Sequence, residues 1–175
     1  MRTLTSSAAA MLLVISGGCA VSQNGTTATR GDAVAMLRTA AGVDVGRAVA
    51  RAEGTRIRIT IDGKAMPAGV HGAHVHTTGR CDAPDFASAG PHWNPTGAQH
   101  GTQNPAGAHA GDLPNLTVAA DGSGSLSMLL PAGTLDAMLD EDGAAMVIHA
   151  AADDLRTDPS GNSGGRIACG VFAAR

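Results

Sequence analysis

Apolar and polar residues alternate with a period of two along most of this chain from residue 31 onward, which is typical of half-buried β-strands. The clearest run covers residues 56–61, where Arg or Thr alternates with Ile57, Ile59 and Ile61. Earlier in the chain, Val34 and Met36 begin the same pattern and lead into a glycine-containing turn region. This alternation predicts strands with one face toward a core and one toward solvent.

Further short runs of this kind are separated by clusters of Gly, Pro, Asn and Asp, which favour turns. The segment 134–139 alone has a helical pattern, and it is too short for more than a turn or two. The sequence therefore predicts an all-β sandwich or barrel of about eight strands, without internal repeats. The expected strands include residues 34–36, 45–50, 56–61, 70–76, 116–119, 126–130, 146–150 and 168–172.

Two connections are unusually long for such a domain, residues 77–115 and residues 153–165. Long loops without secondary structure of their own are usually functional in compact domains. The chemistry of the protein is therefore expected on these two loops.

Composition narrows the class of protein. The 175 residues are 43% apolar and 15% charged, which is typical of a single globular domain. Aromatic residues make up only 2%, and the net charge is −3. Base-stacking platforms and a phosphate-neutralising surplus of cations are both absent from this composition, so we expect no nucleic-acid partner. No apolar run of membrane-spanning length follows the N-terminal segment.

The first residues have the pattern of a secretory signal, with Arg2 followed by an apolar stretch at 8–15 and small residues at 16–18. The position of Cys19 directly after them resembles a bacterial lipoprotein signal, in which this Cys becomes the lipidated first residue. The alternative is ordinary cleavage that discards Cys19. We expect a signal peptide at 1–18, a lipidated Cys and flexible tether at 19–30, and a folded domain at 31–175.

Histidines provide the candidate chemistry. His74 and His76 stand two apart on an expected strand, so both imidazoles leave the same face while Val75 points into the core. His71 would point to the opposite side and is interpreted as structural. His149 lies within an apolar strand, where a single His is more often a hydrogen-bonded core residue than a metal ligand.

The long first loop adds four more donors in a regular series, with spacings of eight, nine and three residues: His92, His100, His109 and Asp112. Each His alone is weak evidence for a metal. Together with His74, His76 and His149 they predict metal binding, and six imidazoles with a carboxylate are too many ligands for one ion.

At this point the sequence resembles the copper/zinc superoxide dismutase family, in its bacterial exported branch. Five ordered features carry the resemblance: HGAHVH at 71–76, AGPHWNP at 89–95, the His and Asp series above, VIHAAADD at 147–154 and GNSGGRIACGV at 161–171. The resemblance covers nearly all of residues 31–175. It implies an eight-stranded Greek-key β-sandwich or barrel with two long functional loops.

The resemblance also implies the ligands. Copper would be held by His74, His76, His92 and His149, and zinc by His92, His100, His109 and Asp112, with His92 bridging both ions. Three nitrogens and one carboxylate oxygen suit zinc, and four imidazoles suit copper.

Four other residues acquire roles from the resemblance. Asp153 would join the free nitrogens of His74 and His100, although the neighbouring Asp154 is equally available. Cys81 and Cys169 would form a disulfide, and Arg166 would dock the anionic substrate.

The implied activity is dismutation of superoxide to dioxygen and hydrogen peroxide, with copper and zinc as cofactors and His92 and Arg166 as catalytic residues. An exported copper-binding or metallochaperone-like domain of the same fold is the alternative, as is a purely structural zinc-binding relative. The expected location is the periplasm, with a membrane anchor if Cys19 is lipidated. The sequence does not distinguish a monomer from a homodimer.

Overall fold

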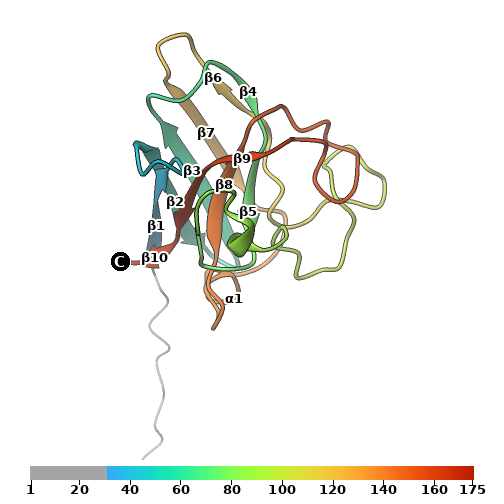
Figure 1. The fold of residues 1–175 in the computed structure, drawn as a ribbon. Helices are drawn as coiled ribbons and strands as arrows, with labels where there is room; N and C mark the ends of the chain where they lie inside the picture. The colour runs from blue at the N-terminus through green and yellow to red at the C-terminus, as the bar shows by residue number, and fades with distance from the viewer. Residues whose placement is uncertain (1–30) are drawn as a thin grey trace, which may run out of the picture.

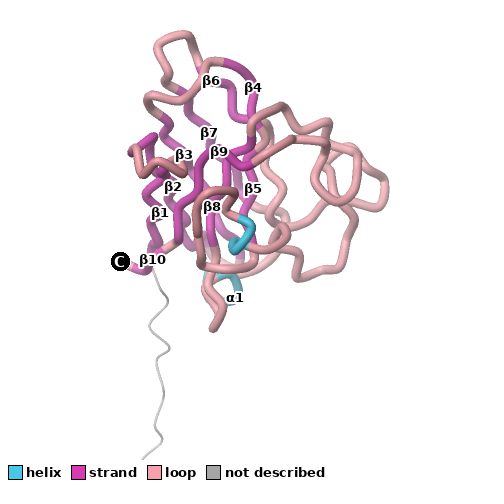
Figure 2. The backbone as a smooth tube through the Cα atoms, viewed as in Figure 1, coloured by secondary structure: helices cyan, strands magenta, loops and turns pink. Residues whose placement is uncertain are grey.

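Strands make up nearly all of the regular structure of the computed structural model, which describes residues 31–175 (Figures 1 and 2). The predicted signal peptide, Cys19 and tether lie outside the described residues. The strands are β1 (Asp32–Arg38), β2 (Asp44–Glu53), β3 (Arg56–Gly63), β4 (Gly69–His71), β5 (Ala73–His76), β6 (Leu116–Val118), β7 (Gly124–Leu129), β8 (Ala145–His149), β9 (Arg166–Val171) and β10 (Ala173–Ala174).

Eight of these strands form one curled antiparallel sheet in the order β5-β8-β9-β1-β2-β3-β7, with β10 paired to β1. Strands β4 and β6 pair separately, and they precede the two edge strands β5 and β7. This pair therefore links the two edges of the large sheet (Figure 1). Because β9 returns from far along the chain to lie beside β1, the connections are of the Greek-key type. The predicted all-β fold is confirmed.

The core lies between the inward faces of this curled sheet. Ile57, Ile59 and Ile61 are all fully buried on β3, as their alternation predicts. The neighbouring strand β2 places Ala48 and Ala50 beside them with no exposed surface. Small side chains on one strand beside large ones on the next allow the layers to interdigitate, which keeps the interior dense.

The expectation for the first strand is wrong about its face. Ala33, Ala35 and Leu37 are fully buried, whereas Val34 is half-buried and Met36 is 46% exposed. The strand continues the alternation, but the small alanines rather than the larger side chains meet the core. In this alanine-rich strand, choosing the face with the larger apolar side chains therefore gives the wrong buried face.

The expected strand at 70–76 is also divided in two. Gly72 separates β4 from β5, and its amide donates to the carbonyl of Ala151 instead of to a neighbouring strand. A Cβ at Gly72 would lie 2.8 Å from the Cβ of Ser163, so this close approach requires glycine. The break turns His71 and His74 onto different sheets.

The predicted helical turn is confirmed as α1 (Leu135–Met138), and a 3-10 turn, η1 (Ala87–Ala89), lies within the first long loop. Within residues 31–175, no helix has the length and apolar character needed to cross a membrane. The two long loops lie side by side at one side of the sheet (Figures 1 and 2). They are joined at Gln103, whose backbone amide donates to the carbonyl of Leu155 and whose side-chain oxygen accepts from the guanidinium of Arg156.

Candidate metal centre

Three imidazoles come from the edge of the large sheet. Strand β5 carries His74 and His76, and β8 pairs with it in the register His74 to Val147. His149 follows at the end of β8, where its amide donates to the carbonyl of Gly72 at 2.8 Å. All three side chains are buried. Regular β pairing therefore fixes these imidazoles through the backbone, as the spacing of His74 and His76 predicts.

The loop at 77–115 adds its histidines by bridging back to the same strand. Isolated backbone bridges join His76 to His92 and His74 to Asp112. Four side chains then offer donor atoms within 4.8 Å of one another, and we call them the first cluster: His74, His76, His92 and His149.

Each sheet-borne imidazole of the first cluster has its outer nitrogen occupied by an acceptor. Nδ1 of His76 lies 2.8 Å from the carbonyl oxygen of Gly90, and Nδ1 of His149 lies 3.2 Å from that of Gly164. Nε2 of His74 lies 2.7 Å from the carboxylate of Asp153. A neutral imidazole that donates from one nitrogen carries a lone pair on the other.

The remaining nitrogens are buried and without a hydrogen-bond partner among the described residues: Nδ1 of His74, Nε2 of His76 and Nε2 of His149. Buried polar atoms are ordinarily satisfied, and metal ligation would satisfy these lone pairs. The first cluster therefore fits a metal ion held by imidazoles.

Burial keeps three rings of the first cluster neutral, those of His76, His92 and His149, and metal ligation requires neutral imidazoles. Desolvation, with repulsion from His92, lowers the pKa of His76 to about 2. Desolvation likewise lowers the pKa of His149 to about 3. For His92, desolvation outweighs the hydrogen bond with Asp112 and lowers the pKa to about 4.

A second cluster gathers around one carboxylate oxygen, and we define it as His92, His100, His109 and Asp112. Oδ1 of Asp112 lies 2.9 Å from Nδ1 of His92, 3.1 Å from Nδ1 of His100 and 3.2 Å from Nδ1 of His109. Nδ1 of His92 and Nδ1 of His109 are 3.4 Å apart. These four distances are close to the separation of about 3.3 Å between neighbouring ligand atoms around a zinc ion with bonds of about 2.0 Å.

The other oxygen of Asp112 is held by the backbone. Oδ2 accepts from the amides of Gly101 at 2.9 Å and His109 at 3.0 Å. Although burial raises the pKa of Asp112, its hydrogen bonds with His100, His92 and Gly101 lower it well below the usual range. The second cluster thus offers three nitrogens and an ionised oxygen, a donor set that suits zinc.

Asp153 joins the two clusters. Its carboxylate contacts Nε2 of His74 at 2.7 Å and Nε2 of His100 at 3.1 Å, and all three side chains are fully buried. Although burial lowers the pKa of His100, its contacts with Asp112 and Asp153 raise it to about 9. A Cβ at Gly161 would collide with the Asp153 carboxylate, so glycine is required there.

The neighbouring Asp154 has a different environment. Its exposed carboxylate accepts from the amides of Arg156 and Thr157 and from the side chain of Asn162, so it shapes its own loop. Hydrogen bonds from Thr157 and Arg156 lower its pKa to about 2. The geometry therefore favours Asp153 over Asp154 as the acid that orients the histidines.

Arg166 lies beside the first cluster on β9. It is half-buried and lines a cavity of about 560 Å³ together with His76, His92 and His149. Nη1 donates to the carbonyl of Phe86 at 2.6 Å and Nη2 to that of Gly90 at 2.8 Å. Partial desolvation lowers the pKa of this guanidinium, which nevertheless titrates far above neutrality.

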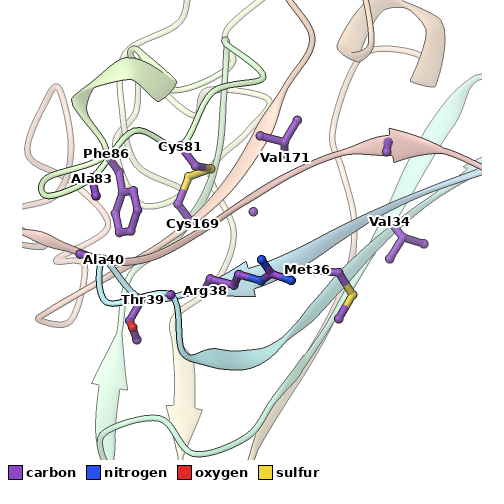
Figure 3. A pocket seen from close by; sticks show the side chains of 13 residues that line it. Val34, Met36, Arg38, Thr39, Ala40, Cys81, Ala83, Phe86, Cys169 and Val171 are labelled. Carbon is purple, nitrogen blue, oxygen red and sulfur yellow. A yellow bond between two sulfur atoms is a disulfide. The ribbon is translucent and has the colours of Figure 1, made fainter.

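The disulfide between Cys81 and Cys169 attaches the first long loop to β9. It lies at a surface pocket of about 450 Å³, with the ring of Phe86 beside it and Met36 on the facing strand (Figure 3). Phe86 is buried with Ala145, Val147 and Cys169 in a small cluster of its own. The covalent link and this cluster fix the segment whose carbonyls hold Arg166.

His71 stands apart from both clusters. Its Nδ1 lies 2.8 Å from the carbonyl of His149, and its Nε2 lies 2.9 Å from that of Pro67. Both nitrogens therefore lie against backbone carbonyls and face neither cluster, which agrees with the structural interpretation.

The structure brings together every histidine and acid predicted from the loop and strand patterns, and it adds groups that the sequence did not indicate. The carbonyls of Phe86 and Gly90 and the side chain of Asn115 are examples. Asn115 donates to the carbonyl of Asp153 and accepts from its amide. Backbone acceptors leave no signal in a sequence, and one amide side chain among many has no distinguishing pattern.

Comparison with known proteins gives consistent relatives. The family model for copper/zinc superoxide dismutase matches residues 45–172. The superoxide dismutase-like protein YojM of Bacillus subtilis is 48% identical over 125 residues, which cover 69% of this chain and 63% of YojM. Superoxide dismutase [Cu-Zn] 1 of Aquifex aeolicus is 40% identical over 136 residues, covering 74% of this chain and 80% of that protein.

Solved structures show the same fold. The crystal structure of a SOD-like protein from Bacillus subtilis has a TM-score of 0.75 and 41% identity, covering 80% of this chain and 97% of that one. The Cu/Zn superoxide dismutase from Brucella abortus has a TM-score of 0.65 and 26% identity, covering 81% and 99%.

Proposed function

This chain belongs to the copper/zinc superoxide dismutase family, and from that premise we propose that it dismutates superoxide to dioxygen and hydrogen peroxide. The observation that carries the proposal is the pair of clusters sharing His92, with Arg166 at the same cavity. His74, His76, His92 and His149 would hold copper. His92, His100, His109 and Asp112 would hold zinc.

Copper would supply two accessible oxidation states, so that one superoxide is oxidised and the next reduced, while zinc has no redox role. The overall balance is two superoxide anions and two protons giving dioxygen and hydrogen peroxide. The protein must therefore attract an anion, position it and deliver protons.

His92 is suited to hold and return a proton. Its Nδ1 is fixed beside Asp112 in the second cluster. Nε2 is then the nitrogen that can take up a proton during one half of the reaction and give it to the forming peroxide in the other. Because the rest of the ring is held by the second cluster, the proton would be returned at the same place.

Arg166 is suited to dock the anion. The two carbonyls that accept from its guanidinium fix its direction. Because the protein as a whole has a net charge of −3, the attraction of superoxide depends on local cations such as Arg166. Superoxide dismutase is a standard example of such electrostatic steering. Partial burial of Arg166 strengthens its field because fewer water molecules screen it.

The position of Asp153 supports a role in orientation. By accepting from Nε2 of both His74 and His100, it would leave Nδ1 of each ring as the nitrogen that holds a metal. One acid therefore sets the tautomer of a ligand in each cluster.

A disulfide supports export, because such links form and persist in oxidising compartments. We propose a periplasmic location, with lipidation of Cys19 as the anchor to the membrane.

The decisive experiment combines metal content with activity on the purified full-length protein. One copper and one zinc for each chain with rapid loss of superoxide would support the enzyme. Both metals bound without turnover would instead support the metal-carrying alternative, to which the name of the SOD-like Bacillus protein also draws attention. Binding of zinc alone would indicate a structural zinc domain.

A further inference from the structure

The loop at 153–165 contains a second acid that faces the histidines of the second cluster. Oδ1 of Asp158 accepts from the backbone amide of His100 at 2.6 Å. The same oxygen lies 3.8 Å from Nε2 of His109. Asp158 therefore accepts a hydrogen bond from one residue of the second cluster and lies near another. It belongs to the second long loop, whereas the cluster lies on the first.

The contact with His100 completes the fixation of that residue. Its Nε2 contacts Asp153, and its Nδ1, which has no hydrogen-bond partner among the described residues, lies 3.1 Å from Oδ1 of Asp112. The Asp158 carboxylate fixes the backbone that carries the ring. Hydrogen bonds from a backbone amide to an ionised carboxylate are stronger than neutral ones, so the position of His100 depends on both acids of one loop.

The approach to His109 acts on its tautomer. A separation of 3.8 Å is too long for a direct hydrogen bond. A negative charge at this distance nevertheless favours the proton of His109 on Nε2, which leaves the lone pair on Nδ1. Nδ1 is the nitrogen that lies 3.2 Å from Asp112 Oδ1 in the second cluster.

We propose that Asp158 is a positioning residue for the zinc half of the site, which raises zinc affinity by holding the backbone of His100 and orienting the outer nitrogen of His109. This inference rests on the proposed zinc site and deepens it. Removal of a group that orients a metal ligand typically costs about 10- to 100-fold in metal affinity.

Two substitutions separate the two contributions. Asp158→Asn keeps an oxygen that can accept from the His100 amide but removes the negative charge. Asp158→Ala removes both. Asp142→Asn is the matched control, because Asp142 is an exposed acid in the turn before β8 and the substitution changes the net charge equally.

The experiment measures zinc affinity of the metal-free, disulfide-bonded protein by competition with a chelator, with zinc as the only metal and no superoxide present. We expect Asp158→Ala to lose about 10- to 100-fold in affinity. Asp158→Asn should fall between Asp158→Ala and wild type, and Asp142→Asn should match wild type. In parallel, the amide proton resonance of His100 should shift in Asp158→Ala and largely return in Asp158→Asn, which a general loss of stability would not produce.

Unchanged zinc affinity in Asp158→Ala would overturn the inference, as would an equal loss in Asp142→Asn. If Asp158→Ala does not fold, Asp158→Asn decides, because the loss of charge alone should lower zinc affinity and an unchanged value would refute the proposal. Failure of the proposed function has a different signature: the wild-type protein would bind no zinc, or it would bind both metals without removing superoxide.

Discussion

Removal of the disulfide between Cys81 and Cys169 should destabilise the domain by an amount that follows from the length of chain it closes. The two residues are separated by 88 positions. In the chain-entropy model, ΔS of about −2.1 − 1.5R ln n gives about −15 cal/mol/K, or about 4.6 kcal/mol at 25 °C. The substitution is Cys81→Ala with Cys169→Ala, because alanine fills most of the buried Cys169 position without adding a polar group.

The assay is urea unfolding of the metal-free protein, since a bound metal would stabilise the native state separately. The free energy of unfolding should fall by about 4 to 5 kcal/mol, which corresponds to a melting temperature lower by roughly 10 to 20 °C for a domain of this size. The slope of free energy against urea should increase, because the unfolded chain without the link exposes more surface.

Wild-type protein reduced by a thiol is the matched control, because it keeps both sulfur atoms and loses only the link. It should unfold with the free energy of the double variant. Equal stability of the oxidised and reduced wild-type proteins would refute the reasoning, and a large difference between reduced wild type and double variant would show that packing of Cys169 dominates.

Four further predictions concern the site and its surroundings. His92→Ala should leave a folded domain, uncouple the two metals and abolish most turnover, whereas wild-type activity with both metals bound would contradict the bridging role. Arg166→Glu should slow turnover without loss of metal. The slowing should be clearest at low ionic strength, because at 0.01 M salt a charge acts over about 30 Å before it is screened. No slowing under these conditions would exclude Arg166 as the docking group. The metal-free protein should lose stability as the pH falls below about 6.5. Burial lowers the pKa of His76, His92 and His149 to about 2, 4 and 3, so only the unfolded chain takes up these protons. Urea unfolding at neutral and mildly acidic pH tests this, and stability that rises on acidification would contradict it. Cys19→Ser should move the protein from the membrane to the soluble periplasmic fraction with unchanged specific activity, and mass spectrometry that finds an unmodified N-terminus beyond residue 19 would exclude lipidation.

The sequence predicted the class of fold and most strands because their alternation reflects burial directly. On β3 the buried Ile side chains are the only large apolar residues, so the pattern has one interpretation. On β1 both faces carry apolar side chains, and packing against the neighbouring strands admits the alanines inside. Met36 and Val34 then line the pocket beside the disulfide instead of the core. Tertiary packing, which no local pattern encodes, decided between the two faces.

The division between β4 and β5 shows a second limit of local pattern. The sequence predicts one strand over residues 70–76, yet Gly72 lies outside the ladder, where its amide donates to Ala151 and Ser163 from the distant loop leaves no room for a side chain. Only the folded arrangement of that loop reveals the contact. The same holds for Asp153 and Asp154, which are adjacent in sequence and differ in the structure by complete burial against exposure.

These differences explain why one half of the site is easier to predict than the other. A period of two in the sequence places His74 and His76 on one face before any loop is known. Strand pairing then brings His149 beside them. The second cluster is built on a loop, where local periodicity gives no positions and the family spacing was needed. Its geometry depends on links from elsewhere: Asp153 at the His100 ring, Asp158 at its backbone, and the disulfide at the start of the loop. We therefore expect the sheet-borne imidazoles to keep their arrangement when the Asp158 link is removed, so that Asp158→Ala affects zinc binding before copper binding.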